Sequence, residues 1–235
     1  VLSGAGAAGI SIAKMLISLG IKKENLILTD IDGVIYKERS NLNPIHKEFA
    51  TKRNVRTLAE AIENADAFIG VSAKGVLKKE MLLSMAKNPI VFALANPDPE
   101  ITYEDATETR SDVIMGTGRS DYPNQINNIL GFPFIFRGAL DVGAREITEN
   151  MKKAATLALV ALTKEEVPNE VKRAYNGQNF TFGQNYIIPK PFDPRIIEWE
   201  ATAVAKQAIL DGVATRSISD WDEYKHSLRE RMKKY

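Results

Sequence analysis

The sequence predicts an α/β fold, in which a doubly wound, mostly parallel sheet is followed by C-terminal helices. Three observations support this prediction. From Val1 to about Gly116, short apolar runs alternate with segments of helical spacing, which is typical of successive βαβ units. A glycine-rich turn stands near the start of the chain, between an apolar run and a helical segment. Helical spacing without apolar strand-like runs returns toward the C-terminus.

Five apolar runs are expected to be strands of the sheet. The first, Val1–Ser3, is shorter than a buried strand usually is, so we expect the chain to begin inside its first strand. The other four runs, each followed by a polar or a Gly- or Pro-containing break, are 26–29, 67–71, 90–94 and 113–115.

Six segments have helical spacing. The first, 10–19, carries a broad apolar stripe and is followed by Gly20 as a C-terminal cap. The other five are 57–65, 79–87, 146–164, 195–210 and 220–231. Two further stretches, 116–141 and 168–194, are rich in Gly, Pro, Asn or aromatic residues and have no sustained period, so we expect them to be irregular.

The composition excludes several classes of function. With 31 Lys and Arg against 30 Asp and Glu, the net charge of +1 provides no strong field toward nucleic acid or anionic lipid. The absence of cysteine excludes a disulfide framework, a thiolate metal site and a cysteine nucleophile. No uninterrupted apolar run reaches the roughly 18 to 20 residues that cross a bilayer. We therefore expect a cytoplasmic protein that binds neither nucleic acid nor membranes.

The glycine-rich turn has a spacing with a known physical basis. In such a turn the first glycine permits a tight bend, the second lets the backbone approach a pyrophosphate, and the third lets the helix pack closely on the strand. The helix N-terminus then directs free N–H groups and the positive end of its dipole at the phosphates. The sequence therefore predicts a Rossmann-like domain that binds a dinucleotide through Gly4, Ala5, Gly6, Ala7, Ala8 and Gly9.

An acid at the end of the next expected strand indicates which dinucleotide is bound. Asp30 follows Gly9 by about 20 residues, the spacing at which a carboxylate binds the adenosine ribose. The alternative is that Asp30 only forms the turn that continues with Asp32-Gly33. Because an acid at this place repels the 2′-phosphate of NADP, and the nearest bases downstream are Lys37 and Arg39, we expect NAD rather than NADP.

Loops at the carboxyl ends of the later strands are expected to line the same crevice. They contribute Val71 and Ser72 after one strand and Ala95 after another, and we expect these three residues beside the dinucleotide. Two asparagines are in loops, Asn96 and Asn128. The local pattern alone predicts that they cap turns or helices rather than contact a ligand.

Other polar groups are expected to be solvated. His46 and His226 are the only histidines and lie too far apart in sequence to suggest a metal pair. Lys74, in a crevice loop, reaches either a phosphate or solvent. The four acids between 98 and 105 (Asp98, Glu100, Glu104 and Asp105) are more typical of a solvated helix start than of a cation site.

Several motifs together resemble the short form of bacterial malic enzyme, over nearly the whole chain. They are the glycine turn, Phe92-Ala93-Leu94-Ala95-Asn96-Pro97, the run from Gly118 to Asn128 that continues to Arg137-Gly138-Ala139-Leu140-Asp141, and the stretch from Tyr186 to Arg195. The resemblance implies oxidative decarboxylation of malate to pyruvate and carbon dioxide. It also implies NAD or NADP as the hydride acceptor and Mg²⁺ or Mn²⁺ in the site.

The resemblance also implies where the site residues lie. In the family, the catalytic Tyr and Lys and the metal ligands precede the glycine turn. We therefore expect no catalytic residue and no metal ligand in this chain, and no activity from it alone. The family places substrate-binding asparagines at Asn96 and Asn128, with Asn127 a weaker candidate, which reverses the capping interpretation. Family members are usually homodimers or larger homo-oligomers.

Two other functions remain open from the sequence. One is malolactic conversion of malate to lactate, with NAD tightly bound and no net reduction. The other is a non-catalytic module that senses NAD. In every case we expect a dinucleotide-binding domain at 1–165, truncated in its first strand. We expect an irregular segment with C-terminal helices at 166–235, packed on that domain or on a preceding one.

Overall fold

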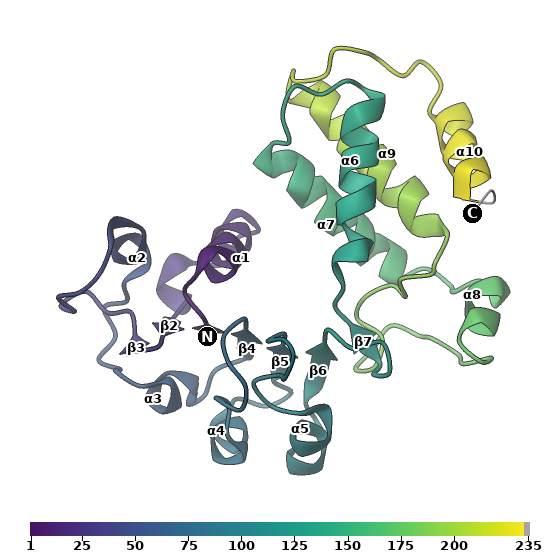
Figure 1. Ribbon diagram of the computed structural model, residues 1–235. Helices are drawn as coiled ribbons and strands as arrows, with labels where there is room; N and C mark the ends of the chain where they lie inside the picture. Colours follow the sequence, from purple (N-terminus) through teal and green to yellow (C-terminus); the bar gives the residue numbers. More distant parts are fainter. Residues whose placement is uncertain (233–235) are drawn as a thin grey trace. The chain divides into compact units, whose positions relative to one another are not determined.

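The computed structural model describes residues 1–232, which divide into two compact units with the boundary between Asn124 and Gln125 (Figure 1). Each unit has hydrophobic clusters of its own. The domain boundary predicted at 165 falls inside the second unit. It stays a prediction, because compact units are defined by packing whereas the predicted domains are defined by function.

The first unit is built on a sheet with the strand order β3-β2-β1-β4-β5-β6-β7. The strands are β1 (Leu2–Ser3), β2 (Leu28–Asp30), β3 (Gly33–Val34), β4 (Ala67–Gly70), β5 (Ile90–Ala93), β6 (Ile114–Thr117) and β7 (Asn124–Gln125). Pairing is parallel from β2 through β1, β4 and β5 to β6, and β3 is antiparallel to β2. These strands confirm the doubly wound, mostly parallel sheet.

The strand order reverses at β1, which has β2 on one side and β4 on the other. Leu2 pairs with Leu28 of β2 on one side and with Ile69 of β4 on the other. In doubly wound sheets a ligand binds where the strand order reverses, at the carboxyl ends of the strands. The fold therefore provides a binding crevice beyond the ends of β1, β2 and β4, where the glycine turn begins.

Helices cover both faces of this sheet. The helices of the first unit are α1 (Ala7–Ser18), α2 (Pro44–Phe49), α3 (Leu58–Ile62), α4 (Lys79–Ser84) and α5 (Tyr103–Thr109), with the short 3-10 helix η1 (Lys23–Asn25). Figure 1 shows α1 and α2 on one side of the strands and α3 to α5 on the other. One hydrophobic cluster includes Ala13 and Leu28, and another includes Leu82 and Val91, so each face has a core of its own.

The second unit is helical and is organised around α9. It contains η2 (Asn128–Leu130), α6 (Phe132–Asp141), α7 (Glu149–Thr163), α8 (Asn169–Ala174), α9 (Arg195–Leu210) and α10 (Trp221–Met232). Helix α9 packs against α6, α7 and α10. Trp199 and Trp221 are partly buried in the clusters around α9. Over the described residues, none of the helices combines the length and the apolar character that a bilayer span requires.

Two stretches that we expected to be irregular contain helices. Helix α6 occupies the second half of 116–141, and α8 lies within 168–194. Proline at the first turn is compatible with a helix, and Pro133 lies there in α6. The small residue Gly138 permits a close contact with α9, because a Cβ there would overlap the carbonyl oxygen of Ala201. Residues that usually break a helix are therefore used here for its start and for close packing.

Candidate functional site

The glycine turn joins β1 to α1, and its three glycines have different surroundings. Gly4 has a φ of +104°, and a Cβ there would lie 2.5 Å from the carbonyl oxygen of Val71. A Cβ on Gly9 would overlap the carbonyl oxygen of Gly4. A Cβ on Gly6 would meet no atom of the described structure within 4 Å. Gly4 and Gly9 are therefore required by the turn itself, whereas Gly6 leaves space in front of the backbone.

The N-terminus of α1 opens toward this space. Gly6 is the N-cap, no side chain accepts a hydrogen bond there, and the first turn contains no acidic residue. The first N–H groups of a helix have no intrahelical acceptor, and with the helix dipole they favour an anion. The turn thus has the shape and the donors that a pyrophosphate requires.

A cavity of about 1250 Å³ lies in the first unit at this turn. It exceeds the roughly 300–1,000 Å³ of sites for drug-sized ligands, so a dinucleotide is a suitable occupant. Six of the predicted cofactor residues line it, namely Gly4, Ala5, Gly6, Ala7, Asp30 and Ser72. The other four, Ala8, Gly9, Val71 and Ala95, are not among the lining residues. Gly9 and Val71 lie directly behind Gly4.

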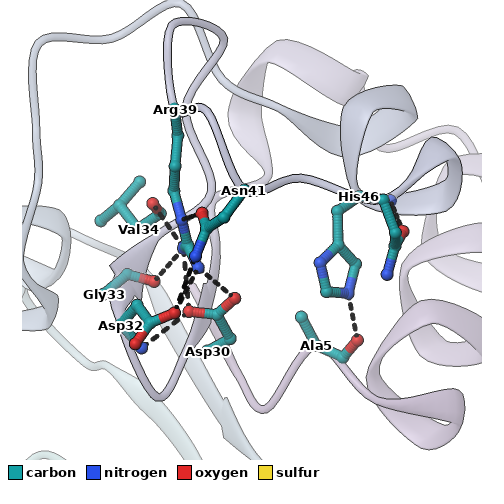
Figure 2. A network of polar contacts seen from close by, with 9 residues as sticks. Ala5, Asp30, Asp32, Gly33, Val34, Arg39, Asn41 and His46 are labelled. Atoms are coloured by element: carbon teal, nitrogen blue, oxygen red, sulfur yellow. Dashed lines mark hydrogen bonds and ion pairs between the residues drawn. The ribbon is translucent and has the colours of Figure 1, made fainter.

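Asp30 belongs to a polar network at the edge of this cavity (Figure 2). Its carboxylate accepts two hydrogen bonds from Arg39, Nη1 to Oδ1 at 2.8 Å and Nη2 to Oδ2 at 2.7 Å. Oδ1 also accepts from the backbone N–H of Asp32 at 2.9 Å. Since a carboxylate oxygen accepts about two hydrogen bonds, Oδ2 has room for one further donor. A ribose hydroxyl is a donor of this kind.

The network keeps Asp30 ionised. Burial raises the pKa of its carboxyl, but the hydrogen bonds from Arg39 and from the Asp32 N–H lower it, and the net pKa lies below the usual value. The pKa of Arg39 is raised, chiefly by its hydrogen bond to Asp30. Asp30 therefore acts only as an acceptor at neutral pH. It also forms the strand-end turn with Asp32, so the two interpretations of this acid are compatible.

The expectation that His46 is solvated is wrong. His46 is half-buried, and its Nε2 lies 2.9 Å from the carbonyl oxygen of Ala5 in the glycine turn (Figure 2). Because a carbonyl only accepts, Nε2 carries the hydrogen. Asn43 caps α2 through the backbone N–H of His46 at 2.7 Å, and this fixes the helix that supports the turn. His226 is exposed, as expected.

The acids after β5 also differ from expectation at one position. Glu100 is fully buried, whereas in the first turn of α5 Glu104 is exposed and Asp105 is half-buried. The Oε1 atom of Glu100 accepts hydrogen bonds from the backbone N–H and the hydroxyl of Ser72, at 2.7 and 3.0 Å. Its Oε2 accepts from the backbone N–H of Ala95 at 3.1 Å. Glu100 thereby connects the two crevice loops that contain the predicted residues Ser72 and Ala95.

The two predicted substrate asparagines lie in different units. Asn96 is exposed in the loop after β5, where its amide nitrogen lies 3.4 Å from the carbonyl oxygen of Leu94. Asn128 is exposed at the start of η2, beside a hollow of about 760 Å³ in the second unit. Asn127 caps η2, because its Oδ1 accepts from the backbone N–H of Ile129 at 3.0 Å. Lys74 lines the cavity at the glycine turn and pairs with Asp98 at 3.0 Å.

Residues 1–232 contain no group of three His, Cys, Asp or Glu side chains arranged to hold a metal ion.

Sequence reasoning missed several residues of the cavity. Apolar surface is added to the cavity by Ile31, Ile45 and Leu58, and the side chain of Ile31 is fully exposed. The sequence signal at Ile31 is an apolar residue between two acids, Asp30 and Asp32, at the end of an expected strand.

The similarity to known proteins is consistent with this site. A family model described as "Malic enzyme, NAD binding domain" matches residues 1–175. An NADP-dependent malic enzyme of Haemophilus influenzae is 54% identical over 232 residues, covering 98% of this chain and 31% of that protein. An NAD-dependent malic enzyme of Rhizobium meliloti is 51% identical over 225 residues, covering 95% and 29%.

A solved structure has the same fold along the whole chain. The malic enzyme of Pyrococcus horikoshii is similar with a TM-score of 0.82 and 34% identity, and the match covers 100% of this chain and 54% of that one. The chain therefore spans about a third of the length of the two relatives above and about half of this one. This chain belongs to the malic enzyme family, and it contains the NAD-binding domain of that family.

Proposed function

We propose that the complete protein catalyses the oxidative decarboxylation of malate to pyruvate and carbon dioxide, with NAD as the hydride acceptor. This chain supplies the dinucleotide site and part of the malate site. The observation that carries the proposal is the space in front of Gly6, which opens into a cavity lined by Asp30. Family membership supports the choice of malate as substrate.

Different residues of the cavity are proposed to bind different parts of the dinucleotide. The backbone of Gly4 to Ala7, at the N-terminus of α1, binds the pyrophosphate. Asp30 accepts a hydrogen bond from the adenosine ribose, and Ile31 contacts the adenine. When bound, NAD accepts the hydride that leaves C2 of malate. The proposed set of cofactor-binding residues around Ser72 is completed by Ala8, Gly9, Val71 and Ala95.

NAD is the proposed cofactor, although relatives named as NADP-dependent and as NAD-dependent both occur. The cavity wall beside the expected ribose position has two carboxylates, Asp30 and Asp32, and both repel a 2′-phosphate. Substitution of Asp30 tests the assignment. Asp30→Ala is expected to weaken binding of NAD more than binding of NADP, and an equal loss for both would remove the ribose assignment.

Malate is proposed to contact Asn96 and Asn128. Amide groups donate to a carboxylate without adding charge, which suits a pocket that also holds a divalent cation. Following the pattern of the malic enzyme family, we propose that the Mg²⁺ or Mn²⁺ ligands and the catalytic Tyr and Lys belong to another part of the complete protein. This chain alone is then inactive.

The complete protein is further proposed to be cytoplasmic and to form a homodimer or a larger homo-oligomer. Helix α6 supports the second point, because Phe132, Phe136 and Leu140 recur along it at four-residue spacing and are exposed. An exposed apolar surface of this kind is typical of an interaction site.

The experiment that tests the function is malate-dependent NAD reduction by the full-length gene product, with and without Mn²⁺, with pyruvate and lactate quantified together. Metal-dependent formation of NADH and pyruvate in equal amounts is expected. Lactate without NADH would select malolactic conversion instead. Dinucleotide binding without any turnover of malate would select a sensing module.

A further inference from the structure

We propose that His46 is a positioning residue of the dinucleotide site. Its imidazole holds the carbonyl oxygen of Ala5, so that the glycine turn presents N–H groups and not a carbonyl oxygen to the pyrophosphate. His46 lines the cavity at the turn, together with Ala5 and Gly6. The proposal rests on the dinucleotide site proposed above, and it assigns to that site a residue outside the glycine motif.

The carbonyl group of Ala5 has a different kind of partner from other carbonyl groups around the turn. The Ser3 oxygen accepts from the backbone N–H of Val71 at 2.9 Å, and the Gly6 oxygen accepts the first hydrogen bond of α1 at 3.0 Å. The Ala5 oxygen instead lies 2.9 Å from Nε2 of His46, which comes from α2 (Figure 2). Its direction is therefore set by a side chain rather than by the sheet or by α1.

The Ala5 carbonyl and the Gly6 N–H belong to the same peptide group. This peptide bond is trans, so the two groups point in opposite directions. Rotation of the peptide group would turn the Gly6 N–H from its present direction and free the Ala5 oxygen to face the ligand. Because a carbonyl oxygen repels a phosphate whereas an N–H binds it, fixing this peptide group favours pyrophosphate binding.

Helix α2 holds the imidazole close to the turn. Asn43 caps this helix by accepting from the backbone N–H of His46 at 2.7 Å. Leu42, just before the helix, and Phe49, at its end, are buried in the same hydrophobic cluster as Ala5. The helix that carries the imidazole and the turn that carries the carbonyl thus share one core, and this core keeps the donor and the acceptor together.

The experiment compares two amides of different length at position 46 of the full-length protein. His46→Gln extends an amide nitrogen far enough to donate to the Ala5 oxygen, whereas the amide of His46→Asn is one methylene shorter and does not reach it. Binding is measured by the fluorescence of NADH and by competition with ADP and with adenosine. Of the two competitors, ADP contains a pyrophosphate and adenosine does not.

His46→Asn is expected to weaken binding of NADH and ADP by about tenfold, the effect of one lost hydrogen bond, and to leave adenosine binding unchanged. His46→Gln is expected to bind NADH and ADP within about threefold of wild type. The control is His226→Asn, the same change at the other histidine, which is exposed in α10 of the second unit. It should leave all three affinities unchanged.

Three results would overturn the proposal. His46→Asn could bind ADP as tightly as wild type, it could lose adenosine binding to the same extent as ADP binding, or His46→Gln could be as defective as His46→Asn. Melting temperatures show whether the variants fold, and His46→Leu, which fills the space of the ring without a donor, is a second variant with the same expected loss. Failure of the proposed function would be distinct, because wild-type protein would then bind neither NADH nor ADP.

Discussion

At the scale of single residues, Glu100 shows how a side chain that does not line the cavity organises the site. Its carboxylate connects the loop after β4, through Ser72, with the loop after β5, through Ala95. The neighbouring strand has Gly70 where any Cβ would overlap the Glu100 carboxyl carbon. A glycine that seems unremarkable in strand β4 is thus the space into which this carboxyl fits.

Replacing Glu100 should therefore affect both stability and binding. Glu100→Ala leaves three donors of the crevice loops without their acceptor, and each unpaired buried donor costs about 1–3 kcal/mol. We expect the free energy of unfolding to fall by several kcal/mol and NAD binding to weaken, as measured by urea denaturation and titration calorimetry. Glu100→Gln keeps one acceptor oxygen and should have a smaller effect. Equal stability of Glu100→Ala and the exposed control Glu108→Gln would contradict this role.

Replacing Asn128 tests the proposed binding of malate. Because its amide is exposed and is proposed to donate to a malate carboxylate, Asn128→Ala should raise KM for malate or lower kcat, with NAD affinity unchanged. Loss of one hydrogen bond to a charged group predicts an effect of about tenfold on kcat/KM. Steady-state kinetics on the full-length protein measure it, and the exposed Asn185→Ala serves as the control. An unchanged kcat/KM would exclude Asn128 from the site.

At the scale of elements, the turn between β1 and α1 separates two roles of glycine. Gly9 is needed because the helix lies against the turn, whereas Gly6 has a φ of −77°, which any residue adopts, and faces open space. Sequence spacing alone treats the two glycines as equivalent parts of one motif. The structure distinguishes the glycine required for folding from the glycine required for the ligand.

Two matched substitutions test this distinction. Gly6→Ala should leave the melting temperature unchanged and weaken NAD binding by at least about tenfold, because the added methyl group occupies the space of the pyrophosphate. Gly9→Ala should lower the melting temperature, because its methyl group collides with Gly4. Thermal unfolding and calorimetric titration provide the two readings. Unchanged NAD affinity in Gly6→Ala would show that the dinucleotide does not approach this turn.

At the scale of the whole molecule, the chain has two units with separate cores, and one buried acid limits the stability of the second. Glu200 in α9 is fully buried, and within the described part of the chain neither carboxylate oxygen has a hydrogen-bond partner. Burial raises the pKa of its carboxyl to about 9. The group is therefore neutral in the folded protein at pH 7 and ionised in the unfolded chain.

This difference predicts a pH dependence of stability. The unfolded carboxyl, with a pKa of 4.5, releases its proton first, so folding becomes less favourable as pH rises from 4.5 to about 9. The loss amounts to about 1.4 kcal/mol per pH unit at most. Glu200→Met removes the titration and should be more stable than wild type, with the difference growing toward pH 9. Amide hydrogen exchange in α9 measures this, and parallel pH profiles for the two proteins would contradict it.

The sequence by itself determined the elements with strong periodicity and the local motif. Helix α9 begins and ends where the spacing predicts, and the glycine turn and Asp30 lie in the order that strand, turn and strand require. These features depend on neighbours along the chain, which the sequence displays directly. Helix α6 escaped prediction because Pro133 lies in its first turn, and because Gly138 is explained only by its close contact with α9.

Only the tertiary structure decided which polar groups meet. His46 and Ala5 are 41 residues apart, Glu100 and Ser72 are 28 apart, and Arg39 and Asp30 are 9 apart. In each pair a polar side chain contacts a group from another segment of the chain, and such pairing is favoured because an unpaired polar group inside the protein is costly. No local pattern contains that information, so two groups expected to be solvated, His46 and Glu100, instead support the site.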